Sequence, residues 1–138
     1  MKLISILNPR LFINVWRAYW RIWVVVRKIR AKDNDWFVAQ ISLRDKNVAQ
    51  GNRAAKDHFN EMHESVRLAA RLHGKWCQCL PRSIALSSLL RQQGENAEVC
   101  LGVVKRGDAL ASHAWVEVDG QMVSEPQQVA DDFRRLIL

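Results

Sequence analysis

Residues 79–86 read CLPRSIAL, and this stretch decides the fold that we expect. Pro81 suits the first turn of a helix, where its missing N–H is not needed, and the following residues continue a helix that ends near Gly94. Unpaired backbone N–H groups and the positive end of the helix dipole then face the sulfur of Cys79 and stabilise its thiolate. The stretch therefore predicts a nucleophilic cysteine at the start of a helix.

A second informative stretch lies downstream, where residues 113–120 read HAWVEVDG. Period-two alternation over 112–118 predicts a strand with His113, Trp115 and Glu117 on one face. A thiol at a helix start and an imidazole on a strand are the two parts of a cysteine nucleophile that a fold must bring together. We therefore expect Cys79 and His113 to meet in an active site.

A third group is needed to orient the imidazole, and Glu125 is the candidate. A two-residue loop at 119–120 points Glu125 to the wrong face of the hairpin, whereas a three-residue loop over 118–120 places it across from His113. We expect the three-residue loop. Asp119 is the rival orienting group.

The same helix start offers donors for an oxyanion. The backbone N–H of Cys79 is the first of these, and the side chain of Gln78 is a weaker candidate. In comparable sites the loss of one such donor costs ~3 kcal/mol of transition-state stabilisation.

A zinc site is the other use for the thiols and imidazoles. Its ligands would come from His73, Cys77, Cys79, Cys100 and His113, a spacing that matches no common finger or ribbon. We expect neither a metal nor another cofactor. Cys77 and Cys100 are interpreted as small apolar residues, and His58 and His63 as surface residues.

Composition limits the chain to one core. It has 138 residues, of which 49% are hydrophobic and 25% charged. Three cysteines without a cleavable signal sequence favour free thiols and a cytoplasmic location. The formal charge of +7 is concentrated near the N-terminus. We see no nucleic-acid-binding motif, which leaves an anionic membrane surface or an acidic protein as charged partners.

The coarse pattern predicts an α+β domain, with helices first and a small antiparallel sheet after them. Helices are expected at 9–30, 52–73, 79–94 and 127–136, and strands at 97–104, 112–118 and 121–125; the segment 36–43 stays untyped. We divide the chain into an N-terminal helical extension, residues 1–50, and a catalytic domain, residues 51–138.

The helix at 9–30 has an unusually wide apolar face with three tryptophans. Arg17 and Arg21 interrupt it, so it does not span a membrane. Three uses remain open for this face: core packing, docking of a partner, and peripheral contact with a membrane. We favour packing, with part of the surface left for a partner.

Taken together, the stretches 79–86, 89–94, 102–103 and 113–120 resemble the transglutaminase-like cysteine peptidases of lasso-peptide biosynthesis, which are related to the C-terminal domain of the microcin-processing protein. The resemblance covers about 53–130. It implies a papain- or transglutaminase-like core with Cys79 as nucleophile, His113 as base and Glu125 as orienting acid. The family usually has Asp after Asn where this chain has Ser124 and Glu125.

The resemblance also implies a function. Such a peptidase removes the leader of a ribosomally made precursor, commonly after Thr and one further residue, and the freed core passes to a separate ATP-dependent lasso cyclase. It implies a separate leader-binding protein as partner. Two other readings stay open: a transglutaminase-type acyl transferase, and a partner-binding module with an inactive site.

Overall fold

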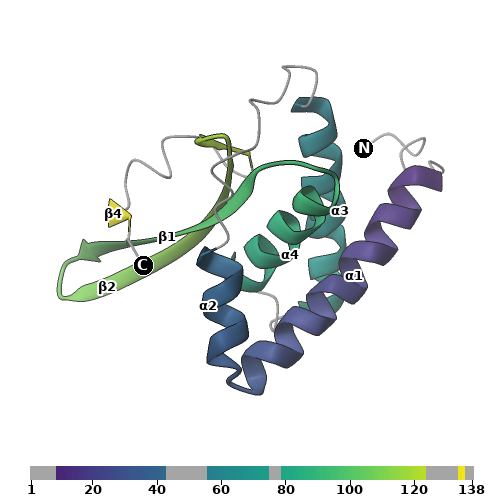
Figure 1. Ribbon diagram of the computed structural model, residues 1–138. Helices are drawn as coiled ribbons and strands as arrows, with labels where there is room; N and C mark the ends of the chain where they lie inside the picture. Colours follow the sequence, from purple (N-terminus) through teal and green to yellow (C-terminus); the bar gives the residue numbers. More distant parts are fainter. Residues whose placement is uncertain (1–8, 43–55, 75–78, 124–133, 136–138) are drawn as a thin grey trace.

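The computed structural model describes residues 9–42, 56–74, 79–123 and 134–135. The described helices are α1 (Pro9–Arg30), α2 (Asn34–Ser42), α3 (Lys56–His73) and α4 (Cys79–Gln92). They precede the strands β1 (Ala97–Arg106), β2 (Ala109–Val118), β3 (Gln121–Met122) and β4 (Arg134–Arg135). The predicted α+β class is confirmed (Figure 1).

The segment that stayed untyped in the sequence is helix α2. Asp33 caps it, because its Oδ1 accepts a hydrogen bond from the backbone N–H of Trp36 at 3.1 Å. Its Oδ2 accepts one from Lys28 at 3.1 Å. The bond from Trp36, and then the one from Lys28, hold the pKa of Asp33 below its usual value. The cap lets the chain reverse directly after α1.

Helix α4 is the centre of the fold. It contacts α1, α3, β1 and β2, and Figure 1 shows it beside the sheet. Two glycines with positive φ follow the predicted helix ends: Gly74 (φ 62°) comes after α3 and Gly94 (φ 85°) after α4. Residues on all sides of α4 are buried: Pro81, Ser83, Ile84, Ala85, Leu86, Ser87, Leu89 and Leu90. Cys79 is thus anchored at the start of a fixed element.

The sheet has the order β3-β2-β1-β4, and its pairs are antiparallel. In the β1–β2 hairpin, Leu101 lies opposite Ala114 and Gly102 opposite His113. One face of the hairpin packs into the core through Val99 and Val116. Alternation then turns the side chain of His113 to the other face.

The loop between β2 and β3 differs from the expected one. Val118 pairs with Gln121, so the loop has two residues. Asp119 (φ 51°) and Gly120 (φ 80°) are both left-handed, as a type I′ turn requires. Its twist matches that of the strands, and the side chain of Asp tolerates the left-handed conformation. The predicted three-residue loop is wrong.

The end of the chain also corrects a prediction. Arg134 and Arg135 form strand β4, which pairs with Gly102 and Val103 of β1, and they are not part of a helix. The edge of β1 offers unpaired N–H and C=O groups, and pairing with them outweighs a local helical pattern. The rest of the predicted helix at 127–136 lies outside the described residues.

Helix α1 shares the main core. Its residues Ala18, Ile22 and Val25 are almost completely buried in the same cluster as residues of α3, α4 and the sheet. The expected packing of this helix is confirmed. None of the described helices is long and apolar enough to cross a bilayer. The proposed boundary near residue 50 lies outside the described residues.

Candidate active site

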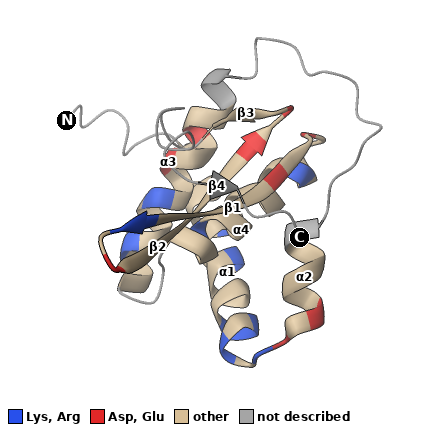
Figure 2. Cartoon of the chain, turned by 90° about the vertical axis from the view of Figure 1, so that its left-hand side faces the viewer, with Lys and Arg blue, Asp and Glu red and all other residues tan. Residues whose placement is uncertain are grey.

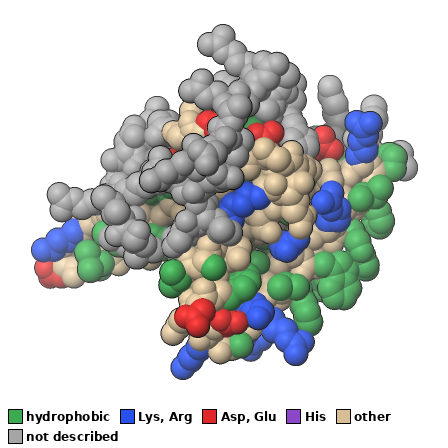
Figure 3. Space-filling view, in the orientation of Figure 1, with side chains coloured by type: hydrophobic (Ala, Val, Ile, Leu, Met, Phe, Trp, Pro, Cys, Tyr) green, Lys and Arg blue, Asp and Glu red, His purple; other side chains and the backbone are tan. Residues whose placement is uncertain are grey.

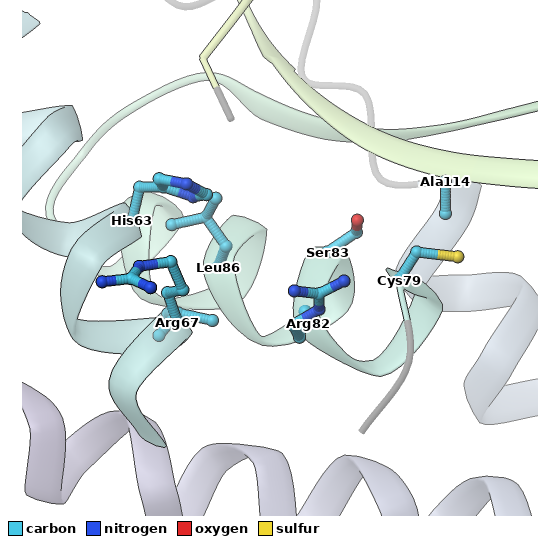
Figure 4. Close-up of a pocket in the computed structure, with 8 residues that line it drawn as sticks. His63, Arg67, Cys79, Arg82, Ser83, Leu86 and Ala114 are labelled. Carbon is cyan, nitrogen blue, oxygen red and sulfur yellow. The ribbon is translucent and has the colours of Figure 1, made fainter. Parts of the chain in front are cut away.

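Cys79 is the first residue of α4 and borders a small pocket (Figure 4). The pocket has a volume of about 40 Å³ and lies between α3, α4 and β2. Its lining residues are His63, Val66, Arg67, Cys79, Arg82, Ser83, Leu86 and Ala114. The thiol is free and half-buried. A substrate group that enters the pocket therefore comes close to the sulfur.

The position of Cys79 confirms the predicted helix start. Backbone N–H groups in the first turn of a helix have no partner within that helix, so they can face a thiolate or an oxyanion. Pro81 stands in this turn, as the sequence predicts. Gln78, the second candidate donor, lies outside the described residues.

His113 is the strand neighbour of a residue that lines the pocket. Ala114 lines the pocket with Cys79. The imidazole of His113 projects from the other face of β2, where it stacks on Trp115 with ring centroids 6.3 Å apart and an interplanar angle of 21°. The predicted contact between the sulfur of Cys79 and the ring of His113 stays a prediction.

The edge of β2 beside His113 is open in the described part of the chain. Strand β3 pairs with β2 at Glu117 and Val118, and the N–H of Val123 reaches the carbonyl of Val116 at 3.1 Å. No other described strand continues along this edge toward His113.

The orienting acid is not located. Glu125 lies outside the described residues, and the two-residue loop removes the register argument that placed it across from His113. Asp119, the rival, is exposed in the loop itself, where its Oδ1 accepts a hydrogen bond from Asn96 at 3.4 Å. Glu125 therefore stays a prediction that depends on the family resemblance.

A polar cluster on the face of His113 was not predicted. Glu117 is 7% exposed, and its Oε1 accepts a hydrogen bond from Nε1 of Trp115 at 3.0 Å. Glu98 lies opposite Glu117 in the strand register, and the thiol of Cys100 donates to Oε1 of Glu98 at 3.9 Å. The sequence signal was the alternation that puts Trp115 and Glu117 on one face.

Metal-binding side chains also gather in this cluster. Ligand atoms of Glu98, Cys100 and Glu117 lie within 4.8 Å of one another, as binding of one cation requires. Within the cluster, the thiol of Cys100 donates to Glu98 and the indole of Trp115 donates to Glu117. Cys100 is 2% exposed, as expected for a small apolar residue, but its thiol also takes part in this polar cluster.

The charge around the pocket is mainly positive. Arg67 and Arg82 line it, and Arg67 pairs with Glu64, whose pKa the hydrogen bond from Arg67 lowers. His63 lines the same pocket, although the sequence indicated a surface residue. Its place follows from the packing of α3 on α4, because His63 borders the buried stripe that begins at Met62.

A further cation, Arg91, lies in the last turn of α4. The guanidinium of Arg91 donates from Nε to the carbonyl of Ala97 at 2.7 Å and from a terminal nitrogen to the carbonyl of Gln40 at 3.3 Å. Burial lowers the pKa of Arg91, while the charge of Glu98 acts in the opposite direction. Arg91 thereby links α2, α4 and β1.

Comparison with known families gives one match. The sequence pattern of the transglutaminase-like superfamily matches residues 22–138. The chain belongs to the transglutaminase-like superfamily. A search of curated proteins and a search of solved structures found no match.

For this transglutaminase-like chain, the match begins within α1 and covers all the later elements. The fold is of the type found in cysteine peptidases and acyltransferases. This agrees with the placement of Cys79 at a helix start beside a sheet.

Proposed function

We propose that this protein is a cysteine peptidase that removes the leader from a ribosomally synthesised lasso-peptide precursor. One observation carries the proposal: Cys79 begins the central helix of a transglutaminase-like fold and borders a pocket against β2. The order of the motifs around Cys79 and His113 supports the choice of substrate class through the family resemblance.

The proposed reaction has two halves. The thiol proton of Cys79 passes to His113, and the thiolate attacks the carbonyl carbon of the peptide bond between leader and core. N–H groups at the start of α4 stabilise the oxyanion, and the departing amine of the core takes the proton from His113. Water then hydrolyses the thioester, which releases the leader carboxylate and restores the thiol.

This reaction requires the ring of His113 to approach the sulfur. The proposal assigns the approach to the open edge of β2 and requires the ring to leave its stack on Trp115. Glu125 orients the imidazole in this proposal, and Gln78 adds a donor to the oxyanion site. These roles depend on the family resemblance, since both residues lie outside the described part of the chain.

The pocket suits a small substrate side chain. A volume of about 40 Å³ has room for only a few water molecules, so it accepts a short side chain and excludes an aromatic one. A Thr near the end of the leader fits this limit. The small pocket and a separate leader-binding protein would together select the precursor peptide. The cyclase would then close the macrolactam of the released core.

The direct test uses a candidate precursor with and without the leader-binding protein. We expect two fragments in the intact mass, and no cleavage by the Cys79→Ala variant, because this change removes the nucleophile. Cys100→Ala is the matched control, since it removes the other described thiol, which lies on the opposite side of the hairpin. Cleavage by folded Cys79→Ala protein would contradict the proposal.

The superfamily match also allows a second function, acyl transfer to an amine. A primary amine added to the same reaction distinguishes the two, because transfer leaves the amine attached to the leader and hydrolysis leaves a free carboxylate. An inactive binding module is recognised by a third result: Cys79 would not react with iodoacetamide at about pH 6, where only an activated thiol is present as thiolate.

A further inference from the structure

The outer face of α1 is apolar and exposed, although the helix is part of the core. Its most exposed large side chains include Phe12 at 71% and Trp16 at 57%. Figure 3 shows hydrophobic side chains along this edge of the molecule. The exposed set, which lies in the first two thirds of the helix, is Phe12, Ile13, Trp16, Trp20, Trp23 and Val24. We call it the aromatic face.

The rings of this face form a continuous ladder. Trp16 and Trp20 meet edge to face with centroids 5.7 Å apart, and Trp20 and Trp23 meet in the same way at 5.9 Å. Such pairs hold one another in place. The aromatic face is therefore preorganised, and it does not need to collapse before it contacts another surface.

Positive charge accompanies the aromatic face. Helix α1 contains Arg and Lys but no Asp or Glu, so all its charged side chains are basic (Figure 2). Arg10, Arg17 and Arg21 follow one another at intervals of seven and four, so they lie along one line of the helix. This line borders the aromatic face and favours an anionic surface as its partner.

A groove continues the aromatic face toward α3. It has a volume of about 400 Å³ and is lined by Trp23, Val26, Arg27, Arg30 and His73. The guanidinium of Arg27 lies over the ring of Trp23, 5.1 Å from its centroid. Two guanidinium groups beside an aromatic wall are suited to a phosphate, which they bind through several donors.

We propose that the aromatic face docks on an anionic lipid bilayer and that the groove receives a phosphate headgroup. Tryptophan rings are favoured at the boundary between headgroups and acyl chains, and basic residues bind the phosphates above it. The aromatic face extends from Phe12 to Val24, about 18 Å along the helix axis. None of the described helices spans a bilayer, so the helix lies on the surface.

The docking surface and the candidate active site are separate. No residue of α1 lines the pocket of Cys79, which is formed by α3, α4 and β2. The aromatic face can therefore meet a membrane while the pocket stays open. The proposal does not depend on the proposed peptidase activity.

Sedimentation with lipid vesicles tests the proposal on the full chain. We expect binding to phosphatidylcholine vesicles that contain roughly a third phosphatidylglycerol, and little binding to pure phosphatidylcholine. Added salt weakens the binding, because screening reduces the attraction between arginines and phosphates. Absence of binding to the anionic vesicles would overturn the proposal.

Two pairs of substitutions locate the surface. Trp16→Gln with Trp20→Gln removes part of the ladder, and Arg27→Gln with Arg30→Gln removes the groove cations. We expect the arginine pair to weaken binding about thirty-fold, at the typical strength of two basic residues near an anionic surface. The tryptophan pair should also weaken it strongly. Reaction of Cys79 with iodoacetamide should stay unchanged in both.

Matched controls come from the exposed end of the β1–β2 hairpin. Lys105→Gln with Arg106→Gln removes two exposed cations, and Leu110→Gln removes a side chain that is 76% exposed. Both should bind vesicles as the parent protein does. An equal loss of vesicle binding in these controls would overturn the proposal. A second result would also overturn it: a parent protein that does not bind vesicles but forms a dimer, which the two tryptophan substitutions convert to a monomer.

Discussion

The two faces of the β1–β2 hairpin differ in the side chains that they carry. The face toward the helices is apolar and includes Val99, Val116 and Val118. The opposite face carries His113 and Glu117, with a hydrogen bond between the indole of Trp115 and the carboxylate of Glu117. Alternation along one hairpin therefore separates the residues that hold the fold from those that can do chemistry.

This difference defines what catalysis must achieve. The thiol of Cys79 belongs to the helix side of β2, because it shares a pocket with Ala114. The imidazole of His113 belongs to the other side, because it stacks on Trp115. The proposed proton transfer therefore requires the ring to leave this stack and to approach the sulfur. Substitutions on the two faces should therefore have different consequences for stability and for catalysis.

The largest effect is expected from a charge on the apolar face. Val116→Asp places a carboxylate at a position with 0% exposure, in apolar surroundings that offer the charge no compensation. We expect a loss on the order of the whole folding free energy, about 5 kcal/mol or more, and an unfolded protein in circular dichroism. Leu110→Asp is the control on the same strand, and it should stay folded because Leu110 is exposed. A folded Val116→Asp variant would contradict the assignment of the faces.

An intermediate effect is expected on the polar face. Glu117→Ala removes the acceptor of the Trp115 indole N–H, which is buried. We expect a loss of ~1–3 kcal/mol in the free energy of unfolding measured with urea, the usual cost of a buried donor without a partner. Glu117→Gln keeps an acceptor oxygen and should lose less. Equal losses in the two variants would show that the carboxylate charge matters more than the hydrogen bond.

Local patterns predicted most elements of this fold. The helix from Cys79, the glycine after it and the alternation of β2 depend on neighbouring residues, and each is confirmed. The loop at 119–120 was also a local problem, since Asp-Gly is a strong signal for a two-residue turn. The prediction failed there because a register that suited Glu125 was preferred to the turn chemistry.

Other features depend on contacts between distant segments. Strand β4 exists because the edge of β1 is available, and nothing within residues 134–135 indicates it. His63 lines the pocket because α3 packs on α4 at an angle that the sequence does not encode locally. The inner face of α1 is buried because α3, α4 and the sheet pack around the same core. Long-range packing decides all three cases.

The smallest effect on stability, and the sharpest test of the comparison, is expected from His113→Ala. Loss of the stack on Trp115 should cost about 1 kcal/mol of unfolding free energy. The rate of peptide cleavage should fall by ~10²–10⁴, the contribution of a general base. Measurement of the urea midpoint and of kcat on the same preparation separates the two effects.

His63→Ala is the matched variant, because His63 lines the same pocket as Cys79 while its ring lies at the far end in Figure 4. As part of the pocket wall, it should change KM more than kcat. The opposite result, a loss of kcat with His63→Ala and none with His113→Ala, would make His63 the base. The reaction would then stay entirely on the helix side of β2, and the polar face of the hairpin would have a structural role alone.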